Sequence, residues 1–439
     1  MSKHKILFAT DVPFWQTSTG AEQRIASLHR YLSGEQYQSQ VFYLGQVADG
    51  ESKLVERHQV DLIQSTSDKP PEKLAGRIRW YADATINQAR NWLNRETVST
   101  LPDNAPESLV LADFDWPWAR TKFAETVEKY QPDTIIFEYI KTAYLMDALS
   151  PKQRKSIKCI VDTHDLLHRR AEQFFSNGFP HWLKIDRDEE AEVINRFDVV
   201  MAIQNKEADL FREMAPVPKT ITVGHAVESQ AVPEPQVQAT TPEEITIGYI
   251  GSKNFSNWQA IRNFLQNAWP SVLERHGDKC NLLIAGAVCN WFDDTVSQES
   301  VSAADHDSDT ATSVAALKPS TMQNVQMIGR IDEIMQFYDR VDVLINPVEF
   351  GTGLKIKNSE ALRYGKLLIT TRNGFDGMPE ATRLACKVVE NVDEMGMAIN
   401  SLCSDLSSIR KMQSLALQLS QTEFSETQAY SELADELSG

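Results

Sequence analysis

The feature of this sequence that most restricts its fold is the run over residues 341–374, where a strand, a glycine loop, a helix and a second strand follow one another. Residues 341–345 are apolar and mostly β-branched, which predicts a buried strand. Residues 354–364 have helical periodicity, and Gly365 is placed to end that helix. Residues 367–370 form the next apolar run. This order predicts a strand–helix–strand unit of an α/β protein.

The segment between the first strand and the helix favours a bound anion. Gly351-Thr352-Gly353 forms a loop whose backbone can approach a ligand closely, and the helix N-terminus after it offers free N–H groups. Lys355 and Lys357 add charge in the first turn, where the helix dipole disfavours lysine unless an anion is bound. Glu360, further along, is placed to accept hydrogen bonds from ribose hydroxyls. An ordinary crossover helix with solvated lysines is the alternative.

The stretch GTGLKIKNSEALRYGKLLITTRNG resembles the donor-site signature of family 4 glycosyltransferases of the GT-B fold, also described as glycosyl transferases group 1. The resemblance implies two Rossmann-like domains whose parallel sheets face each other across a cleft. It also implies a nucleotide-diphospho-sugar donor and retention of anomeric configuration. In that family the second glutamate of a Glu-x7-Glu pair binds the ribose, and Glu360 matches it. Thr352 stands at the position of the first glutamate, and Glu349 is the candidate to replace it.

Length and charge limit the classes of protein that fit. A chain of 439 residues is too long for a single core, so two or three domains are expected. The formal net charge of -17 argues against nonspecific binding to nucleic acid or anionic lipid, and any anion site must be a local positive spot. No apolar run approaches the ~18 residues of a membrane span, and the first one is too short for a signal peptide.

The cysteines favour a reducing compartment. The chain has five, none of them in CxxC spacing, and most lie in apolar runs, as expected of buried free thiols. We therefore expect a cytoplasmic protein, and the sequence leaves attachment to a membrane surface open.

The N-terminal half repeats the order of strand, loop and helix. Residues 5–10 predict a strand and residues 21–32 an amphipathic helix, with Thr19 and Gly20 in the loop between them. The resemblance implies that this loop lies between donor and acceptor, whereas a plain strand-to-helix turn is the alternative. Further strands are expected over 40–44, 133–138, 157–161 and 198–203.

One of these strands ends in a cluster of polar residues, Asp162-Thr163-His164-Asp165. Polar groups at the carboxyl end of a strand lie where open α/β sheets place their binding sites. The resemblance implies that His164 approaches the donor sugar and the reaction centre. The alternative is a strand-end histidine bonded to Asp162 or Asp165.

A proline-rich segment with little hydrophobic pattern, residues 226–243, marks a domain boundary. We expect residues 1–225 to form an acceptor-side domain and residues 244–419 a nucleotide-sugar-binding domain. The resemblance implies that residues 420–439 form a helix that crosses back to the first domain. A segment rich in serine and aspartate, 297–323, is expected to form a surface helix and loop.

The second domain is expected to open with a strand over 245–250 and a tight turn after it, with further strands over 282–286 and 325–330. The resemblance places this turn on the donor phosphates and the residues after Gly329 on the base. The full assignment gives catalytic roles to His164 and Lys355, the donor phosphates to Gly251, Ser252, Lys253, Gly353, Leu354 and Lys355, the ribose to Glu360, the base to Arg330 and Ile331, and the loop at the donor sugar and acceptor to Thr19, Gly20 and Thr352.

The leading hypothesis is a retaining hexosyltransferase that moves a sugar from a UDP- or GDP-sugar to a hydroxyl of a glycan or glycolipid. On family grounds it would act in surface polysaccharide biosynthesis. Lys355 and Lys253 would take up charge that develops on the leaving nucleoside diphosphate. We expect no metal, no other cofactor and no nucleic acid. Two alternatives stay open: a sugar-nucleotide epimerase of the same fold, and a scaffold that binds a nucleotide sugar without catalysis.

Overall fold

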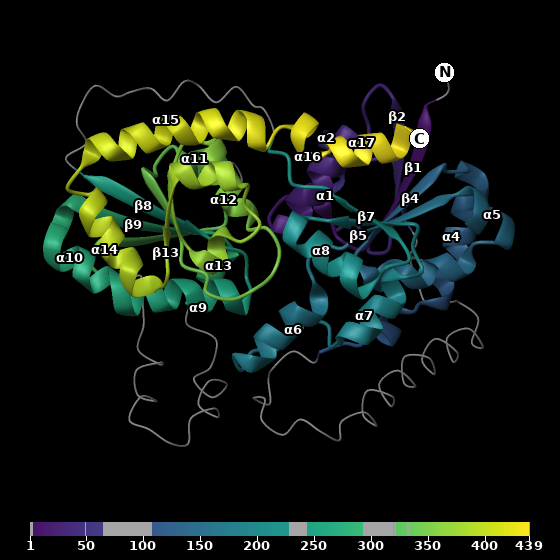
Figure 1. Cartoon of the computed structure of the whole chain (residues 1–439), viewed down its shortest axis with the longest axis horizontal. Coiled ribbons are helices and arrows are strands. Elements are labelled where there is room, and N and C mark those ends of the chain that lie inside the picture. The colour runs from purple at the N-terminus through teal and green to yellow at the C-terminus, as the bar shows by residue number, and fades with distance from the viewer. Residues whose placement is uncertain are drawn as a thin grey trace.

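The computed structural model describes residues 3–48, 50–64, 108–227, 244–292, 319, 322–331 and 334–438. They form two α/β domains side by side, each built on a parallel sheet (Figure 1). The prediction of two parallel-sheet domains is therefore confirmed. Residues 228–243 of the expected linker, and most of the segment 297–323, lie outside the described residues.

The N-terminal sheet has seven parallel strands in the order β3-β2-β1-β4-β5-β6-β7. Successive residues of β1 enter different cores, because Ile6 and Phe8 face one layer of helices while Leu7 and Ala9 face the other. Burial on both faces explains why such a strand reads as a continuous apolar run. The strands are β1 His4–Thr10, β2 Tyr37–Tyr43, β3 Leu62–Gln64, β4 Thr134–Glu138, β5 Lys158–Asp162, β6 Val199–Ala202 and β7 Lys219–Thr222.

The first helix of this domain has a well-formed N-terminal cap. Thr19 Oγ1 accepts a hydrogen bond from the Glu22 N–H, and the Glu22 carboxylate accepts one from the Thr19 N–H. This capping box fixes where the helix begins. The helices are α1 Gly20–Tyr31, α2 Ser52–Arg57, α4 Pro117–Tyr130, α5 Pro151–Ser156, α6 Leu167–Ser176, α7 Arg187–Ile194 and α8 Asn205–Met214, with 3-10 segments at Phe14–Gln16, Leu111–Phe114 and Ile140–Ala148.

The C-terminal sheet has six parallel strands in the order β10-β9-β8-β11-β12-β13. In both sheets the strand order reverses once, between β1 and β4 in the first and between β8 and β11 in the second. The crevice at the carboxyl ends of the flanking strands is where such sheets bind ligands. The strands are β8 Ile245–Ile250, β9 Cys280–Ala285, β10 Val325–Gly329, β11 Val343–Asn346, β12 Leu367–Thr371 and β13 Cys386–Val389.

Helices cover both faces of this second sheet (Figure 1). They are α9 Phe255–Asn263, a π-helical turn at Phe264–Ala268, α10 Trp269–His276, α11 Ile334–Tyr338, α12 Ile356–Arg363, α13 Arg372–Phe375 and α14 Val392–Leu402, with 3-10 segments at Gly277–Lys279, Ala287–Trp291 and Glu380–Ala385. Helix α12 is the one that follows the glycine loop, so its N-terminus lies at the crevice.

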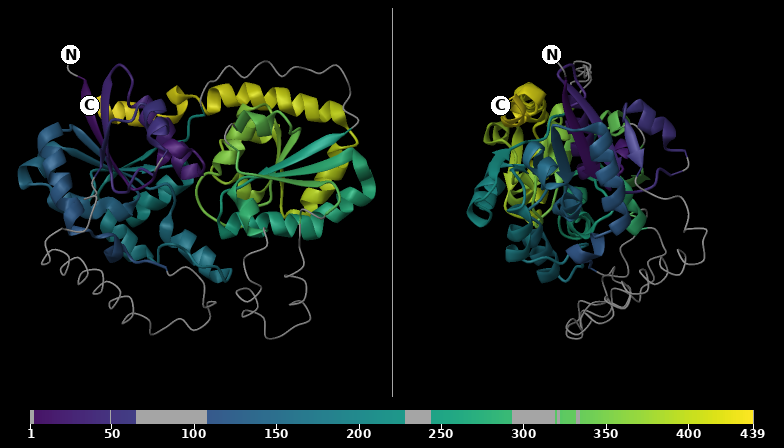
Figure 2. Two further views of the ribbon diagram at one scale, coloured as in Figure 1. Left: turned by 180° about the vertical axis from the view of Figure 1, so that it is seen from behind. Right: turned by 90° about the vertical axis from the view of Figure 1, so that its right-hand side faces the viewer.

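The last three helices, α15 Leu406–Glu423, α16 Glu426–Ala429 and α17 Ser431–Ser438, run along one side of both domains. Helix α15 lies on the C-terminal domain, and α17 ends near the N-terminus of the chain (Figures 1 and 2). Tyr430, Leu433 and Leu437 enter the core that also holds Ile6 and Phe8. These buried side chains tie the end of the chain to the N-terminal domain.

Sequence analysis did not predict the strands β3, β7 and β13. Two of them, β7 and β13, are edge strands of four residues whose sequences, KTIT and CKVV, carry lysines and no long apolar run. Such segments pair with a neighbour once the sheet exists but give a weak signal of their own. Among the described residues, none of the helices has both the length and the apolar character needed to cross a membrane.

Candidate functional site

Two loops of the C-terminal domain meet where its strand order reverses. We name them the β8 turn, residues 251–254, and the glycine loop, residues 350–355. Helix α9 joins them, because Ser256 Oγ donates a hydrogen bond to a carbonyl of the glycine loop (3.0 Å) while Asn257 Nδ2 donates to the carbonyl of Ser252 (3.1 Å). The two segments that the sequence places on the donor phosphates are therefore neighbours.

The next two strands end beside the β8 turn. The Gly286 N–H, after β9, donates to the carbonyl of Gly329 at the end of β10 (2.7 Å). Gly286 has φ +88°, and a Cβ there would collide with the carbonyl oxygen of Gly251, so the close approach requires glycine. Arg330 and Ile331 follow directly, with Arg330 exposed. Sequence reasoning missed Gly286, although a glycine just after an apolar strand was a usable signal.

Lys355 turns back onto the glycine loop. Its Nζ donates to the carbonyls of Gly351, Thr352 and Gly353 at 3.3, 3.1 and 2.9 Å. An ammonium has three N–H donors, so these bonds account for all of them. Burial lowers the pKa of Lys355 to about 8. Lys355 thus holds the loop in its shape.

Lys357, the second residue of α12, makes different contacts. Its Nζ donates to Asn257 Oδ1 (2.8 Å) and lies 4.7 Å from the centre of the Tyr249 ring. Burial, with the nearby charge of Lys355, lowers the pKa of Lys357 to about 7. This lysine therefore connects α12 with the residue that holds the β8 turn.

His164 lies at the carboxyl end of β5 with a left-handed backbone, φ +58°. Its imidazole is 5% exposed, stacks on Tyr139 with ring centroids 4.1 Å apart, and places Nε2 2.7 Å from Glu138 Oε2. The side chain is therefore held inside the N-terminal domain. The backbone of His164 is the part that faces the glycine loop, because its carbonyl oxygen lies 3.1 Å from where a Cβ of Gly353 would be.

A buried ion pair fixes this strand end. Arg24 on α1 donates to both carboxylate oxygens of Asp162, with the shortest contacts at 2.8 Å. Burial alone would raise the pKa of Asp162, but the Arg24 guanidinium lowers it. Burial, and then the Asp162 charge, raise the pKa of Glu138 to about 7. Ligand atoms of Glu138, Asp162 and His164 lie within 4.8 Å of one another. In this group Asp162 is already paired with Arg24, and His164 Nε2 with Glu138.

The glycine loop contacts carboxylates of the N-terminal domain. The Gly353 N–H donates to Glu207 Oε1 (2.9 Å), and Thr352 Oγ1 donates to Asp165 Oδ1 (3.2 Å). Gly353 has φ +73°, and a Cβ there would collide with Asp165 Oδ1. The Gly351 N–H donates to Gln173 Oε1 (2.6 Å). These contacts join the predicted donor loop to the end of β5, to α6 and to α8.

Glu207 was not a candidate in the sequence analysis. It is 4% exposed at the start of α8, directly after β6, and burial with the nearby Asp165 charge raises its pKa to about 7. Glu349, the residue considered as a replacement for the glutamate absent at Thr352, is exposed. The carboxylates that contact residues 352 and 353 are instead Asp165 and Glu207. The signal in the sequence that could have indicated Glu207 was its position as a polar residue shortly after an apolar strand.

The N-terminus of α1 packs against α12. A Cβ on Gly20 would lie 3.5 Å from Ile356 Cδ1, so the loop of Thr19 and Gly20 does reach the glycine-loop helix. Glu360 on the same helix accepts a hydrogen bond from Tyr338 Oη (3.5 Å), and burial raises its pKa to about 7. The side chain of Thr19 is engaged in capping α1.

The remaining predicted residues of the β8 turn and glycine loop differ in exposure. Ser252 Oγ accepts hydrogen bonds from Asn254 Nδ2 and Asn257 Nδ2, both at 3.1 Å. Lys253 is exposed, and Leu354 is partly buried in the C-terminal core. The charge of Lys253 is therefore in contact with solvent at the β8 turn.

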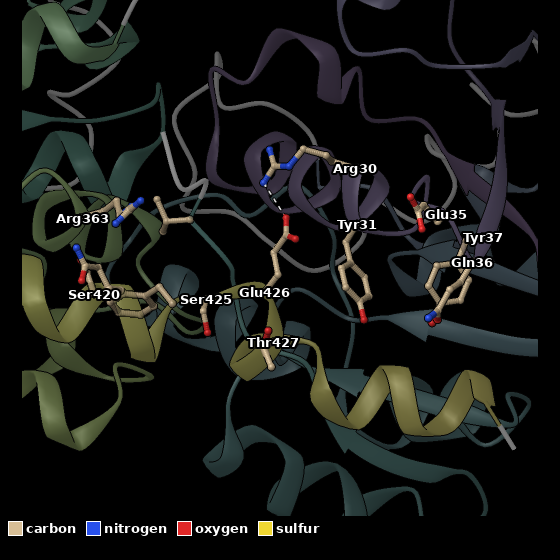
Figure 3. Close-up of a pocket in the computed structure, with 14 residues that line it drawn as sticks. Arg30, Tyr31, Glu35, Gln36, Tyr37, Arg363, Ser420, Ser425, Glu426 and Thr427 are labelled. Atoms are coloured by element: carbon tan, nitrogen blue, oxygen red, sulfur yellow. Dashed lines mark hydrogen bonds and ion pairs between the residues drawn. The ribbon is translucent and has the colours of Figure 1, made fainter. Parts of the chain in front are cut away.

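A cavity of about 840 Å³ lies at the other end of α1 and α12, where the chain passes between the domains (Figure 3). Arg30 and Tyr31 line it from α1 and Arg363 from α12, while Glu426, which forms an ion pair with Arg30 (3.4 Å), lines it from α16. The cavity does not include the glycine loop or the β8 turn. It is thus separate from the site described above.

Residues 244–405 match the family model described as "Glycosyl transferases group 1". This region contains the β8 turn, Gly286, Arg330 and the whole of α12. No curated protein matches the sequence.

Solved structures of similar fold cover both domains. HepE of Anabaena in complex with UDP and glucose has a TM-score of 0.64 at 14% identity, covering 99% of this chain and 100% of that one. Sucrose-phosphate synthase of Thermosynechococcus elongatus has a TM-score of 0.63 at 13% identity, covering 99% and 98%. WaaG, a glycosyltransferase involved in lipopolysaccharide biosynthesis, has 0.56 at 12%, covering 99% and 100%. The chain therefore has the GT-B fold of glycosyltransferases.

Proposed function

We propose that this protein is a retaining glycosyltransferase of the family 4 type, which moves a hexose from a nucleoside-diphosphate sugar to a hydroxyl of a glycan or glycolipid. The observation that carries the proposal is the meeting of the β8 turn and the glycine loop at the crevice of the domain that matches the glycosyltransferase model. Backbone amides, a helix N-terminus and two lysines gather there, which is the chemistry of a diphosphate site.

The chemistry would depend mainly on electrostatics. As the bond between the anomeric carbon and the phosphate oxygen breaks, negative charge develops on the leaving nucleoside diphosphate. Backbone amides at the N-terminus of α12, with an ammonium group of its first turn, would stabilise that charge. Deleting one preorganised donor typically costs about 2.7–4 kcal/mol in the transition state. The acceptor hydroxyl would attack from the leaving-group side, and this attack on the same face gives retention. Its proton would pass to the departing phosphate.

The other residues would position the donor and acceptor. Glu360 would accept hydrogen bonds from the ribose, and Arg330 with Ile331 would lie against the base. His164, Thr352 and Gly20 would border the donor sugar and the acceptor. The contacts between the glycine loop and the N-terminal domain suit a reaction that must exclude water.

For the donor base, uridine is the first choice because HepE, of the same fold, was solved with UDP and glucose; guanosine is the second. WaaG acts in lipopolysaccharide biosynthesis, which favours an acceptor in surface polysaccharide assembly. We propose that the enzyme works in the cytoplasm without a metal ion, and that a glycolipid acceptor would bring it to a membrane surface.

The experiment is incubation of the purified protein with a panel of UDP- and GDP-sugars, with and without glycan or glycolipid acceptors, in the presence of EDTA. Acceptor-dependent release of nucleoside diphosphate is the expected result, with NMR of the product showing the donor's anomeric configuration. Isomerised sugar without transfer would indicate an epimerase, and binding without turnover a scaffold. Inversion at the anomeric carbon would overturn the retaining mechanism.

A further inference from the structure

The two lysines at the start of α12 differ in what their ammonium groups already contact. All three donors of Lys355 reach carbonyls of the glycine loop. For Lys357, one side-chain acceptor, Asn257 Oδ1, is found among the described residues, and the ring of Tyr249 lies on another side. Within the residues that the structure describes, no carboxylate forms an ion pair with Lys357. At least one N–H of this partly buried ammonium is thus available to a ligand.

The side-chain amide of Asn257 sets where this ammonium lies. Its oxygen accepts from Lys357, and its nitrogen donates to the carbonyl and to Oγ of Ser252, both at 3.1 Å. The Tyr249 hydroxyl donates to the backbone carbonyl of Asn257 (2.9 Å), so the amide is itself held in place. Lys357 is therefore fixed between α12 and the β8 turn, at the crevice where the sheet order reverses.

From this difference we propose that Lys357, rather than Lys355, is the catalytic residue that contacts the donor's diphosphate, and that Lys355 is a positioning residue for the glycine loop. The inference rests on the proposed function and names the cation of that site. It predicts a ligand with a compact, multiply charged anion, such as a pyrophosphate, rather than a neutral sugar alone.

The charged and titratable groups that face Lys357 agree with this role. Lys355 lies before it on the chain and disfavours its charge, Glu360 on the same helix favours it, and Tyr249 presents an aromatic face. Burial is the largest effect and lowers the pKa of Lys357 to about 7. A bound anion would raise that pKa again, so anion binding and protonation of Lys357 favour each other.

The test compares Lys357→Met, Lys357→Arg and Lys355→Met with Lys366→Met, a control near the other end of α12. Calorimetry would measure binding of UDP, UMP, GDP, GMP and inorganic pyrophosphate, and thermal unfolding would show that each variant folds. In wild type we expect UDP or GDP to bind tighter than its monophosphate, and we call this ratio of affinities the diphosphate advantage. Lys357→Met should reduce that diphosphate advantage about 10- to 100-fold, the effect of losing a hydrogen bond to a charged group. Lys366→Met should not reduce it.

The pH dependence of diphosphate affinity distinguishes a direct contact by Lys357 from support of the glycine loop by Lys355. Diphosphate affinity in wild type should fall as pH rises from 6 to 9 because Lys357 loses its charge, and Lys357→Arg should remove that part of the fall. The wild-type pH response should persist in Lys355→Met. An unchanged diphosphate advantage in Lys357→Met, with its loss in Lys355→Met, would overturn the assignment.

Failure of the inference and failure of the proposed function give different results. If pyrophosphate binds in a Lys357-dependent way but no nucleotide does, the anion contact stands and the nucleotide-sugar function fails. If wild type transfers sugar while Lys357→Met keeps its diphosphate advantage, the inference alone fails. If wild type binds none of these probes, both fail.

Discussion

The carboxyl edges of the two sheets have the same topology and opposite chemistry. The N-terminal edge holds buried carboxylates, including Glu138, Asp162 and Glu207. The C-terminal edge holds glycines and the two lysines of α12. Buried carboxylates disfavour an anion at the first edge, whereas glycines and lysines are compatible with one at the second, where we propose that the diphosphate binds.

The two edges are also held in shape by different means. At the N-terminal edge, side chains hold each other through the Arg24–Asp162 pair and the contact of His164 with Glu138. At the C-terminal edge side chains contribute too, but the backbone itself makes close contacts, because a Cβ on Gly286 or Gly353 would collide with a neighbour. The first edge should therefore respond to loss of charge, and the second to added volume.

The largest expected effect is at the N-terminal edge. Arg24→Met should lower the free energy of unfolding by about 3–5 kcal/mol, because it leaves the charge of Asp162 buried without a partner. Arg24 and Asp162 are 2% and 0% exposed, whereas the Arg154–Asp198 pair is 31% and 41% exposed. Arg154→Met, as the control, should cost about 0–1 kcal/mol in urea denaturation. Equal losses in the two variants would show that the buried pair does not fix this edge.

At the C-terminal edge, Gly353→Ala should reduce turnover about 100-fold, the effect of a displacement of about 1 Å at a reacting centre. The added methyl would collide with Asp165 and push the glycine loop from the N-terminal domain. Gly277→Ala is a matched control, because Gly277 also has positive φ, +54°, but a Cβ there meets nothing within 4 Å. Both variants carry backbone strain, so only the collision differs between them. Similar kinetics in the two would mean that the contact with Asp165 does not matter.

The C-terminal edge was the easier one to predict from sequence. The apolar run of β8 is followed by Gly251, that of β11 ends at Asn346-Pro347, and α12 begins just after Gly353, so local pattern was enough to place these three elements. The roles of Lys355 and Lys357 could not be separated, because both point from the first turn and only the packed loop decides which carbonyls are in reach.

The N-terminal edge depends on contacts between distant segments. Arg24 and Asp162 are 138 residues apart, and Glu207 meets Gly353 across 146 residues. Nothing in the local pattern of α1 or α8 indicates these partners. Sequence reasoning placed His164 at the end of its strand, but the direction of the imidazole, toward Glu138, follows from a neighbouring strand.

Glu207, the buried carboxylate at the domain contact, should destabilise the folded protein when it is charged. The pKa of Glu207 is raised from 4.5 to about 7, so folding favours its protonated form. Ionisation of Glu207 therefore destabilises the folded protein. This destabilisation is absent below about pH 4.5 and reaches its full value as pH rises through 7. Glu207→Gln should be more stable than wild type by about 3 kcal/mol at pH 8 and equal to it at pH 4. The exposed Glu192→Gln should show no such difference, and a pH-independent gain would contradict the assignment.

The smallest expected effect concerns the exposed charge pair across the domain contact. Lys206 Nζ lies 3.0 Å from Asp376 Oδ1, with the side chains 67% and 33% exposed. Such a pair is screened by water and salt, so a double-mutant cycle of Lys206→Ala and Asp376→Ala should give a coupling below about 0.5 kcal/mol in unfolding and in turnover. If the two edges are joined by the buried contacts of the glycine loop, this pair adds little. A coupling above about 2 kcal/mol would show instead that surface charge holds the domains together.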